Sequence, residues 1–176
     1  MRRRLVIVSG APGAGKTTLA VPLAAYLHYP LFSKDFIKET LVDVLGDDAG
    51  SLDASRRLGG AAMELLWSLA TRTPFAVLEA NFRPHSDYEL GKLRSLKADI
   101  VEIHCDCGPA ETARRFAARA ATSTHHAGAH PLRALPPAML AEYDRPMGVG
   151  ATIAVDTTKP IDIPALALDV CDRWAL

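Results

Sequence analysis

The sequence predicts an α/β protein in three layers, with a mostly parallel sheet between helices on both faces. The first observation behind this prediction is the alternation of short apolar runs with helical patterns along all 176 residues. The second is a glycine-rich turn at residues 10–17, which joins the first apolar run to the first helical pattern. In such sheets ligands bind outside the carboxyl ends of the strands, so we expect the functional residues there.

Apolar runs predict strands at residues 5–9, 30–33, 75–80, 99–104 and 151–155. Helical periodicity predicts helices at residues 16–28, 35–45, 55–72, 87–96 and 109–121. It also predicts a last helix between Asp162 and Trp174, with Asp162 as its N-terminal cap. The second and third of these helices each have an expected apolar side. On the second helix this side consists of Phe36, Ile37, Thr40, Leu41, Val44 and Leu45, and on the third of Leu58, Ala62, Leu65, Leu66 and Leu69.

The length suits one domain over residues 1–176. Residues 47–53 predict a loop. Residues 122–137 show no periodicity and are rich in small and turn-forming residues, so we expect a lid at about residues 115–137. The histidines in this segment, His125, His126 and His130, are expected to be solvated, and contact with the substrate or the phosphates is the alternative.

The charge balance argues against polyanionic partners. Lys and Arg total 20 and Asp and Glu total 20, so the chain lacks the broad positive field of proteins that bind polynucleotides or anionic membranes. A small molecule is therefore the expected partner. The arginines at residues 2–4 precede too short an apolar run for a signal peptide, which predicts a cytoplasmic protein. The three cysteines are expected to be reduced thiols and not metal ligands.

Residues 10–17 fit the pattern G-x-x-x-x-G-K-[ST], which is typical of loops that bind the phosphates of a nucleoside triphosphate. Its glycines let successive N–H groups face the phosphates, and the following helix adds the positive end of its dipole. Lys16 is expected to contact the β- and γ-phosphates, and the Thr17 hydroxyl is expected to bind Mg²⁺. The predicted nucleotide contacts are Gly10, Ala11, Pro12, Gly13, Ala14, Gly15, Lys16, Thr17 and Thr18.

Polar residues follow the second and third predicted strands. Asp35 is the expected base for a substrate hydroxyl, although an acidic residue at a helix start also acts as a cap. Glu79 is expected to contact Mg²⁺ through water, and it is the rival of Asp35 for the role of base. Lys38, Asn81 and Arg83 are expected to contact the acceptor substrate. A solvated surface position is the alternative for Lys38 and Arg83.

Arg115 and Arg119 lie one turn apart on the helix before the lid and share a face with Glu111, while Arg114 is expected to point elsewhere. An arginine beside a transferring phosphoryl group stabilises the charge of the transition state. We favour Arg119, which is nearer the lid, over Arg115; an exposed Glu–Arg pair is the alternative. Thr157, after the last strand, is expected to border the adenine.

These motifs together carry a family resemblance. They are the loop at residues 10–17, Asp35-x-x-Lys38, Glu79, Arg115 and Arg119, and the ending Val155-Asp156-Thr157-Thr158. With them the chain resembles small P-loop kinases, in particular the group of zeta-toxin-like kinases, chloramphenicol phosphotransferase and the kinase domain of polynucleotide kinase. The resemblance implies a P-loop NTPase fold with strand order 2-3-1-4-5, an aspartate base at Asp35 and a lid arginine. Polynucleotide-kinase-like members usually have Arg at the position of Lys38, and the third strand commonly ends in Asp where this chain has Glu79.

The expected function is therefore the transfer of the γ-phosphate of ATP, with Mg²⁺, to a hydroxyl of a small molecule such as an antibiotic, a sugar or a nucleoside. One alternative is a kinase of nucleic-acid 5′-hydroxyls, whose binding would weaken steeply with salt. The other is a nucleotide-hydrolysing switch or ATPase. A GTPase switch would need an Asn/Thr-Lys-x-Asp motif, which the chain lacks.

Overall fold

The computed structural model describes residues 2–46, 51–123 and 125–175. Five strands form its sheet, in the order β2-β3-β1-β4-β5. They are β1 (Arg3–Ser9), β2 (Leu31–Ser33), β3 (Phe75–Glu79), β4 (Ala98–Asp106) and β5 (Ala151–Asp156). All four strand pairings are parallel. The predicted α/β class and the order implied by the resemblance are both confirmed.

The helices agree with the predicted ranges to within a few residues. They are α1 (Lys16–Leu27), α2 (Lys34–Leu45), α3 (Leu52–Arg72), α4 (Asp87–Ser95), α5 (Pro109–Ala120) and α7 (Ile163–Ala175). The short α6 (Pro137–Leu140) and a 3-10 turn at Ala141–Tyr143 were not predicted. Of the predicted loop at residues 47–53, residues 47–50 lie outside the described part, and α3 already begins at Leu52. No described helix is long and apolar enough to span a bilayer.

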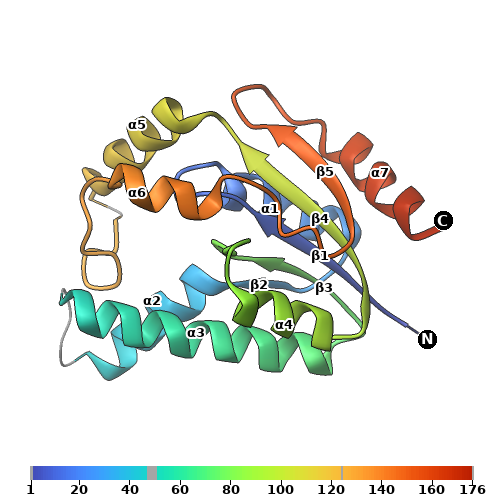
Figure 1. Ribbon diagram of the computed structural model, residues 1–176, viewed down its shortest axis with the longest axis horizontal. Coiled ribbons are helices and arrows are strands. Elements are labelled where there is room, and N and C mark those ends of the chain that lie inside the picture. The colour runs from blue at the N-terminus through green and yellow to red at the C-terminus, as the bar shows by residue number, and fades with distance from the viewer. Residues whose placement is uncertain (1, 47–50, 124, 176) are drawn as a thin grey trace.

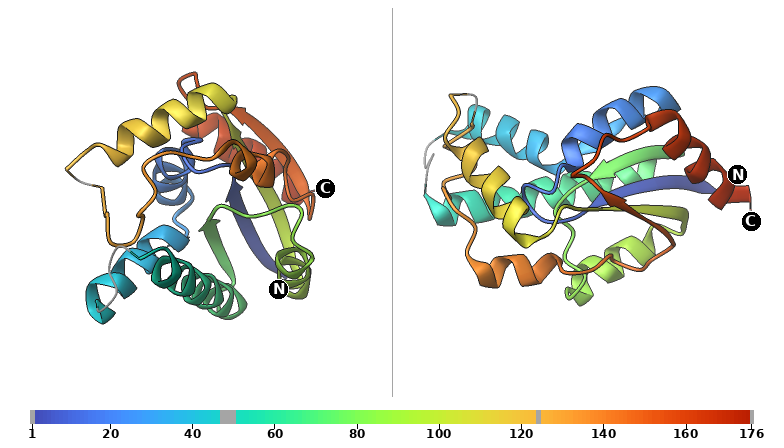
Figure 2. Two further views of the ribbon diagram at one scale, coloured as in Figure 1. Left: turned by 60° about the vertical axis from the view of Figure 1, so that its left-hand side comes forward. Right: turned by 90° about the horizontal axis from the view of Figure 1, so that it is seen from above.

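The central strand β1 is buried on both faces. Val6 and Val8 face a core completed by α1 and α7, while Leu5 and Ile7 face a second core with α3 and α4. All four side chains are 0% exposed. The helices thus form a layer on each face of the sheet (Figures 1 and 2). Because the strands are parallel, their carboxyl ends share one edge, where α2, α5 and the loop between α5 and α6 also lie (Figure 1).

The predicted apolar sides of α2 and α3 are partly wrong. Phe36, Val44 and Leu45 on α2 are 72%, 76% and 56% exposed, and Leu65 and Leu69 on α3 are 44% and 39% exposed. The reason is that α2 packs mainly against α3 at the edge of the sheet, so it buries a narrow stripe. The buried residues of these helices are Lys38 and Val42 on α2, and Ala54, Ser55, Ala62, Leu66, Trp67 and Ala70 on α3.

A buried carboxylate connects three parts of the chain. Glu102 on β4 is 0% exposed and accepts a hydrogen bond from the Ser9 hydroxyl at 2.6 Å. It also accepts hydrogen bonds from the backbone N–H groups of Met147 and Gly148, at 2.8 and 3.0 Å. The carboxylate therefore holds the segment that leads into β5 against the end of β1.

We expect Glu102→Ala to lower the free energy of unfolding by about 3–5 kcal/mol, because it leaves a cavity, the buried N–H group of Met147 and the partly buried N–H group of Gly148 without their partner. Urea unfolding followed by circular dichroism measures the effect. Glu142→Ala, which removes an exposed carboxylate, is the control and should change the value by less than about 0.5 kcal/mol. Equal effects of the two substitutions would contradict the structural role of Glu102.

Candidate functional site

The loop between β1 and α1, residues 10–15, is here called the phosphate loop. At three of its positions the backbone has a conformation that only glycine adopts easily. Gly10, Gly13 and Gly15 have φ values of +131°, +94° and +84°. A Cβ at Gly10 would lie 2.3 Å from the carbonyl oxygen of Cys105, and one at Gly13 would lie 2.7 Å from that of Thr112. The loop thus wraps the start of α1 in close contact with β4 and α5, as a loop that offers backbone N–H groups to an anion requires.

One side of the site is lined by Lys16, Thr17 and Glu79. The Lys16 side chain folds over the loop and donates to the carbonyl of Ala11 at 2.8 Å. Burial lowers the pKa of Lys16, and the carboxylates of Glu79 and Asp35 act against that shift. The Thr17 hydroxyl lies 3.3 Å from Oε1 of Glu79. The other carboxylate oxygen of Glu79 accepts a hydrogen bond from the Ser33 hydroxyl. A hydroxyl and a carboxylate thus share the position beside the phosphate loop.

Asp35 lies one residue into α2, at the carboxyl end of β2. The ammonium of Lys34 lies 2.8 Å from its Oδ1 atom. Burial alone would raise the pKa of Asp35, but Lys34, His130 and Lys16 together hold it well below its ordinary value. Asp35 therefore stays ionised at neutral pH. The helix cap is provided by Ser33, whose hydroxyl accepts from the N–H of Phe36, so Asp35 is not needed as a cap.

These groups line one cavity of about 330 Å³ at the carboxyl edge of the sheet. Eleven residues line it: Pro12, Gly13, Gly15, Lys16, Thr17, Thr18, Asp35, Glu79, Asn81, Arg115 and Arg119. All of them except Pro12 and the loop's glycines carry polar side chains. The Oδ1 atom of Asn81 is buried and has no hydrogen-bond partner among the described residues, so it can accept a hydrogen bond from a ligand.

Both predicted arginines of α5 reach this cavity, in different ways. Arg115 donates to Oε1 of Glu111 at 2.6 Å and to the carbonyl of Thr157 at 3.2 Å. Arg119 lies over the ring of Phe116 and makes no ion pair within the described chain. The expectation that Arg114 points away from Glu111 is wrong, because Arg114 donates two 2.7 Å hydrogen bonds to that carboxylate. Arg119 is therefore better placed than Arg115 to pair with a bound phosphate.

Six of the predicted site residues do not line this cavity: Gly10, Ala11 and Ala14 of the loop, and Thr157, Arg83 and Lys38. The Thr157 hydroxyl donates to the carbonyl of Ala14 at 2.8 Å and so supports the loop from behind. Arg83 pairs with Glu89 at 2.7 Å and lines a second cavity of about 400 Å³. Lys38 is only 5% exposed and donates to the Ser55 hydroxyl at 2.7 Å. The surface position considered for Lys38 is therefore wrong.

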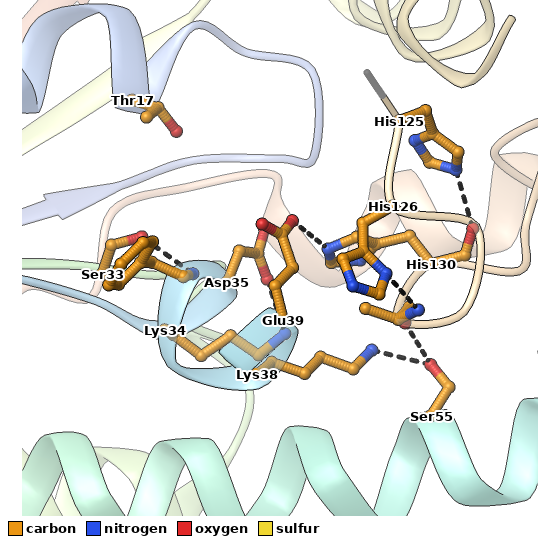
Figure 3. Close-up of polar contacts among 12 residues, drawn as sticks. Thr17, Ser33, Lys34, Asp35, Lys38, Glu39, Ser55, His125, His126 and His130 are labelled. Atoms are coloured by element: carbon orange, nitrogen blue, oxygen red, sulfur yellow. Dashed lines mark hydrogen bonds and ion pairs between the residues drawn. The ribbon is translucent and has the colours of Figure 1, made fainter. Parts of the chain in front are cut away.

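The expectation of solvated histidines in the lid segment is also wrong. His130 Nε2 lies 2.9 Å from a carboxylate oxygen of Glu39, and His126 Nε2 lies 2.9 Å from one of Asp43. Both acceptors are on α2. His125 Nε2 bonds to the backbone carbonyl of His130 at 2.8 Å. The carboxylates of α2 thus hold this part of the lid segment at the site, and Figure 3 shows the contact of Glu39 with His130.

A family model described as AAA domain matches residues 5–146, most of the chain. The chain belongs to the AAA domain family. This match covers the phosphate loop, Asp35, Glu79 and both arginines of α5. Membership of the finer group of zeta-toxin-like, chloramphenicol phosphotransferase-like and polynucleotide-kinase-like proteins remains a prediction.

Solved structures of kinases share the fold. A candidate kinase from Chloroflexus aurantiacus j-10-fl has 29% identity and a TM-score of 0.83, over 98% of this chain and 99% of that one. Shikimate kinase from Acinetobacter baumannii, in complex with shikimate, has 15% identity and a TM-score of 0.60, over 97% and 92% of the chains. The Mycobacterium tuberculosis APS kinase has 20% identity and a TM-score of 0.55, over 99% of both. No curated protein matches the chain.

Sequence reasoning missed Lys34 and Ser55. Lys34 directly precedes the predicted base, and two adjacent charges of opposite sign at a strand end were a signal for an ion pair. Ser55 gave no signal, because its partners Lys38 and Ala129 lie 17 and 74 residues away in sequence. Helical periodicity cannot identify such contacts.

We expect Lys38→Met to stabilise the protein at pH 7. Burial, and then the nearby charge of Lys34, lower the pKa of Lys38 from 10.5 to about 8. Below pH 8 the folded state therefore holds an unfavourable buried charge, and between pH 8 and 10.5 the unfolded state binds more protons, so stability rises with pH there. Removing the charge should add about 1–3 kcal/mol at pH 7, and the gain should shrink across that window.

Urea unfolding at pH 7 and pH 10 measures this difference. Lys159→Met is the control, since that side chain is 76% exposed. A Lys38→Met variant less stable than the parent at pH 7 would mean that the hydrogen bond to Ser55 outweighs the cost of the buried charge.

Proposed function

We propose that the protein is an ATP- and Mg²⁺-dependent phosphotransferase that moves the γ-phosphate to a hydroxyl of a small molecule. The observation that carries this proposal is the presence of Asp35, ionised and partly open, in the same cavity as Lys16 and Arg119. A site that only hydrolyses nucleotide has no need of an acceptor-side carboxylate at this position. The kinases among the similar folds support the general class.

In the proposed mechanism the loop and Lys16 hold the β- and γ-phosphates of ATP. Lys16 releases the Ala11 carbonyl and contacts the phosphate oxygens instead. Arg119 compensates the charge that develops on the transferring group. Arg115, fixed by Glu111 and Thr157, borders the nucleotide from the side of α5.

Asp35 acts on the acceptor. The hydroxyl replaces Lys34 at a carboxylate oxygen of Asp35, which orients the oxygen of the acceptor toward the phosphorus. Because its pKa is held low, Asp35 is a weak base and takes the proton only late in the transfer. A loose, metaphosphate-like transition state needs little base strength, so positioning is its main contribution. The Oδ1 atom of Asn81 can accept a hydrogen bond from a second hydroxyl of the acceptor.

The residues present fit Mg²⁺. The Thr17 hydroxyl would bind the ion directly, and Glu79 would hold one of its water molecules. When bound, Mg²⁺ would neutralise charge on the phosphates. No cluster of three or more acidic, histidine or cysteine side chains in the described residues offers a metal site of its own, which agrees with an ion held mainly by phosphate oxygens and water.

Incubation with γ-labelled ATP and a panel of sugars, nucleosides, antibiotics, other alcohols and oligonucleotides tests the proposal. We expect label on at least one small alcohol. Label only on oligonucleotide 5′-hydroxyls would instead favour the polynucleotide kinase. Release of phosphate that no acceptor stimulates would favour the ATPase or switch.

We expect Asp35→Asn to lower phosphoryl transfer at least about 100-fold, since an amide orients the acceptor hydroxyl more weakly than a charged carboxylate does and cannot take its proton. The dissociation constant of ATP should change by less than about threefold, because Asp35 contacts the acceptor and not the nucleotide. Single-turnover transfer and equilibrium ATP binding measure the two effects. Transfer at the parent rate would contradict the role of Asp35 and leave Glu79 as the candidate.

The two arginines should differ in their kinetic effects. Arg119→Ala is expected to lower kcat by about 10²- to 10³-fold, because it removes a charge from the transition state. Arg115→Ala should mainly raise KM for ATP, by about tenfold, because Arg115 supports the nucleotide side of the site. Arg94→Ala, on the exposed side of α4, is the control. The reverse pattern would exchange the two assignments.

A further inference from the structure

The residues His125 to His130, here called the lid loop, contact α2 and α3 at three places. His126 and His130 pair with Asp43 and Glu39 of α2, as described above. The third contact is the Ser55 hydroxyl of α3, which donates to the carbonyl of Ala129 at 2.8 Å. Figure 3 shows Lys38 and Ser55 facing each other below the lid loop, with Asp35 and Glu39 on the adjacent side of α2.

Two consecutive hydrogen bonds, which join Lys38, Ser55 and Ala129, form the buried part of this contact. Lys38 donates to Ser55, and Ser55 donates to Ala129. The exposed fractions of the three residues are 5%, 7% and 0%. Within the described chain Lys38 has no carboxylate within ion-pair distance, so a charged group is buried against a neutral hydroxyl. This arrangement costs folding free energy.

The lid loop itself has a defined shape. The N–H of Ala129 donates to Nδ1 of His126 at 3.0 Å, so Nδ1 is an acceptor and the hydrogen of the neutral ring is on Nε2, which faces Asp43. The N–H of His130 donates to the carbonyl of His126 at 2.9 Å. The loop can therefore move as a unit whose shape is kept by its own hydrogen bonds.

The contact is suited to reversible docking. Apart from Ala129, it is built from hydrogen bonds and partly exposed ion pairs, each of which contributes little net stability. Glu39 lies one helical turn after Asp35, so the docked His130 stands next to the acceptor side of Asp35.

We propose that the lid loop docks on α2 and α3 to close the acceptor side of the site over a small molecule, and that Lys38 and Ser55 are positioning residues for this closure. This inference rests on the proposed function. Docking would exclude water from the transferring phosphate and leave no exit for a polymeric acceptor beyond Asp35. Lys38 and Ser55 act through Ala129 and need not touch the substrate.

Ser55→Ala tests the proposal, because it removes one hydroxyl and changes little else. Ser68→Ala is the matched control, thirteen residues and about 20 Å farther along α3. Hydrogen exchange measured by mass spectrometry over residues 119–135 reports docking without any acceptor. We expect exchange in this segment to become about tenfold faster in Ser55→Ala and to stay unchanged in Ser68→Ala. Equal exchange in Ser55→Ala and the parent would overturn the docking role.

Enzyme assays test the closure. For an alcohol that the panel identifies as acceptor, the ratio of ATP hydrolysis to phosphoryl transfer should rise about five- to tenfold in Ser55→Ala and in Lys38→Met, with the KM for ATP nearly unchanged. A merely structural role would lower both rates together and leave the ratio unchanged, which would overturn the proposal. Lys38→Arg keeps a hydrogen-bond donor, so its ratio of ATP hydrolysis to phosphoryl transfer should lie between those of the parent and of Lys38→Met.

The proposed limit on the size of the acceptor is tested with pairs of monomer and oligomer. One pair is thymidine and an oligothymidylate with a free 5′-hydroxyl, and the other is glucose and maltotriose. We expect any acceptor in these pairs to be the monomer. Transfer to an oligomer as fast as to its monomer would overturn the closure, although the protein would still be a kinase. If no alcohol is phosphorylated at all, the proposed function fails, and hydrogen exchange alone then reports whether the lid loop docks.

Discussion

The parallel pairing of β1 with β3 and β4 is the constraint on which the site depends. It places the ends of all three strands at one edge, so the loop after β1 meets Glu79 from β3 and the carbonyl of Cys105 from β4. The burial of β1 on both faces fixes that position, since its side chains cannot move without disturbing two cores. The donor half of the site follows from this geometry with few further interactions.

The features that could be predicted from the sequence are those with a local signal. The phosphate loop, the strand ends at Asp35 and Glu79 and the cap of the last helix are each encoded within a few neighbouring residues. Ala165 N–H does bond to Asp162, for example. The cavity then brings together Lys16, Asp35, Glu79 and the two arginines, which come from four separate elements.

The contacts of the lid loop with α2 could not be predicted, because they join distant segments of the sequence. His130 and Glu39 are 91 residues apart, and His126 and Asp43 are 83 apart. The buried sides of α2 and α3 were predicted only in part for a related reason. Their periodicity indicates helices correctly, but which stripe is buried depends on the neighbour, and here α3 presents small residues and a serine to the buried Lys38.

The hydrogen bonds of Glu102 also bear on where the folding unit ends. The family match stops at residue 146, while two of the N–H groups that satisfy this carboxylate belong to Met147 and Gly148. A fragment cut at the boundary of the match would keep the buried charge and lose both donors. It would also lose β5 and α7, which cover β4 and one face of α1. We therefore expect the smallest piece that folds on its own to be longer than the region that the family model matches.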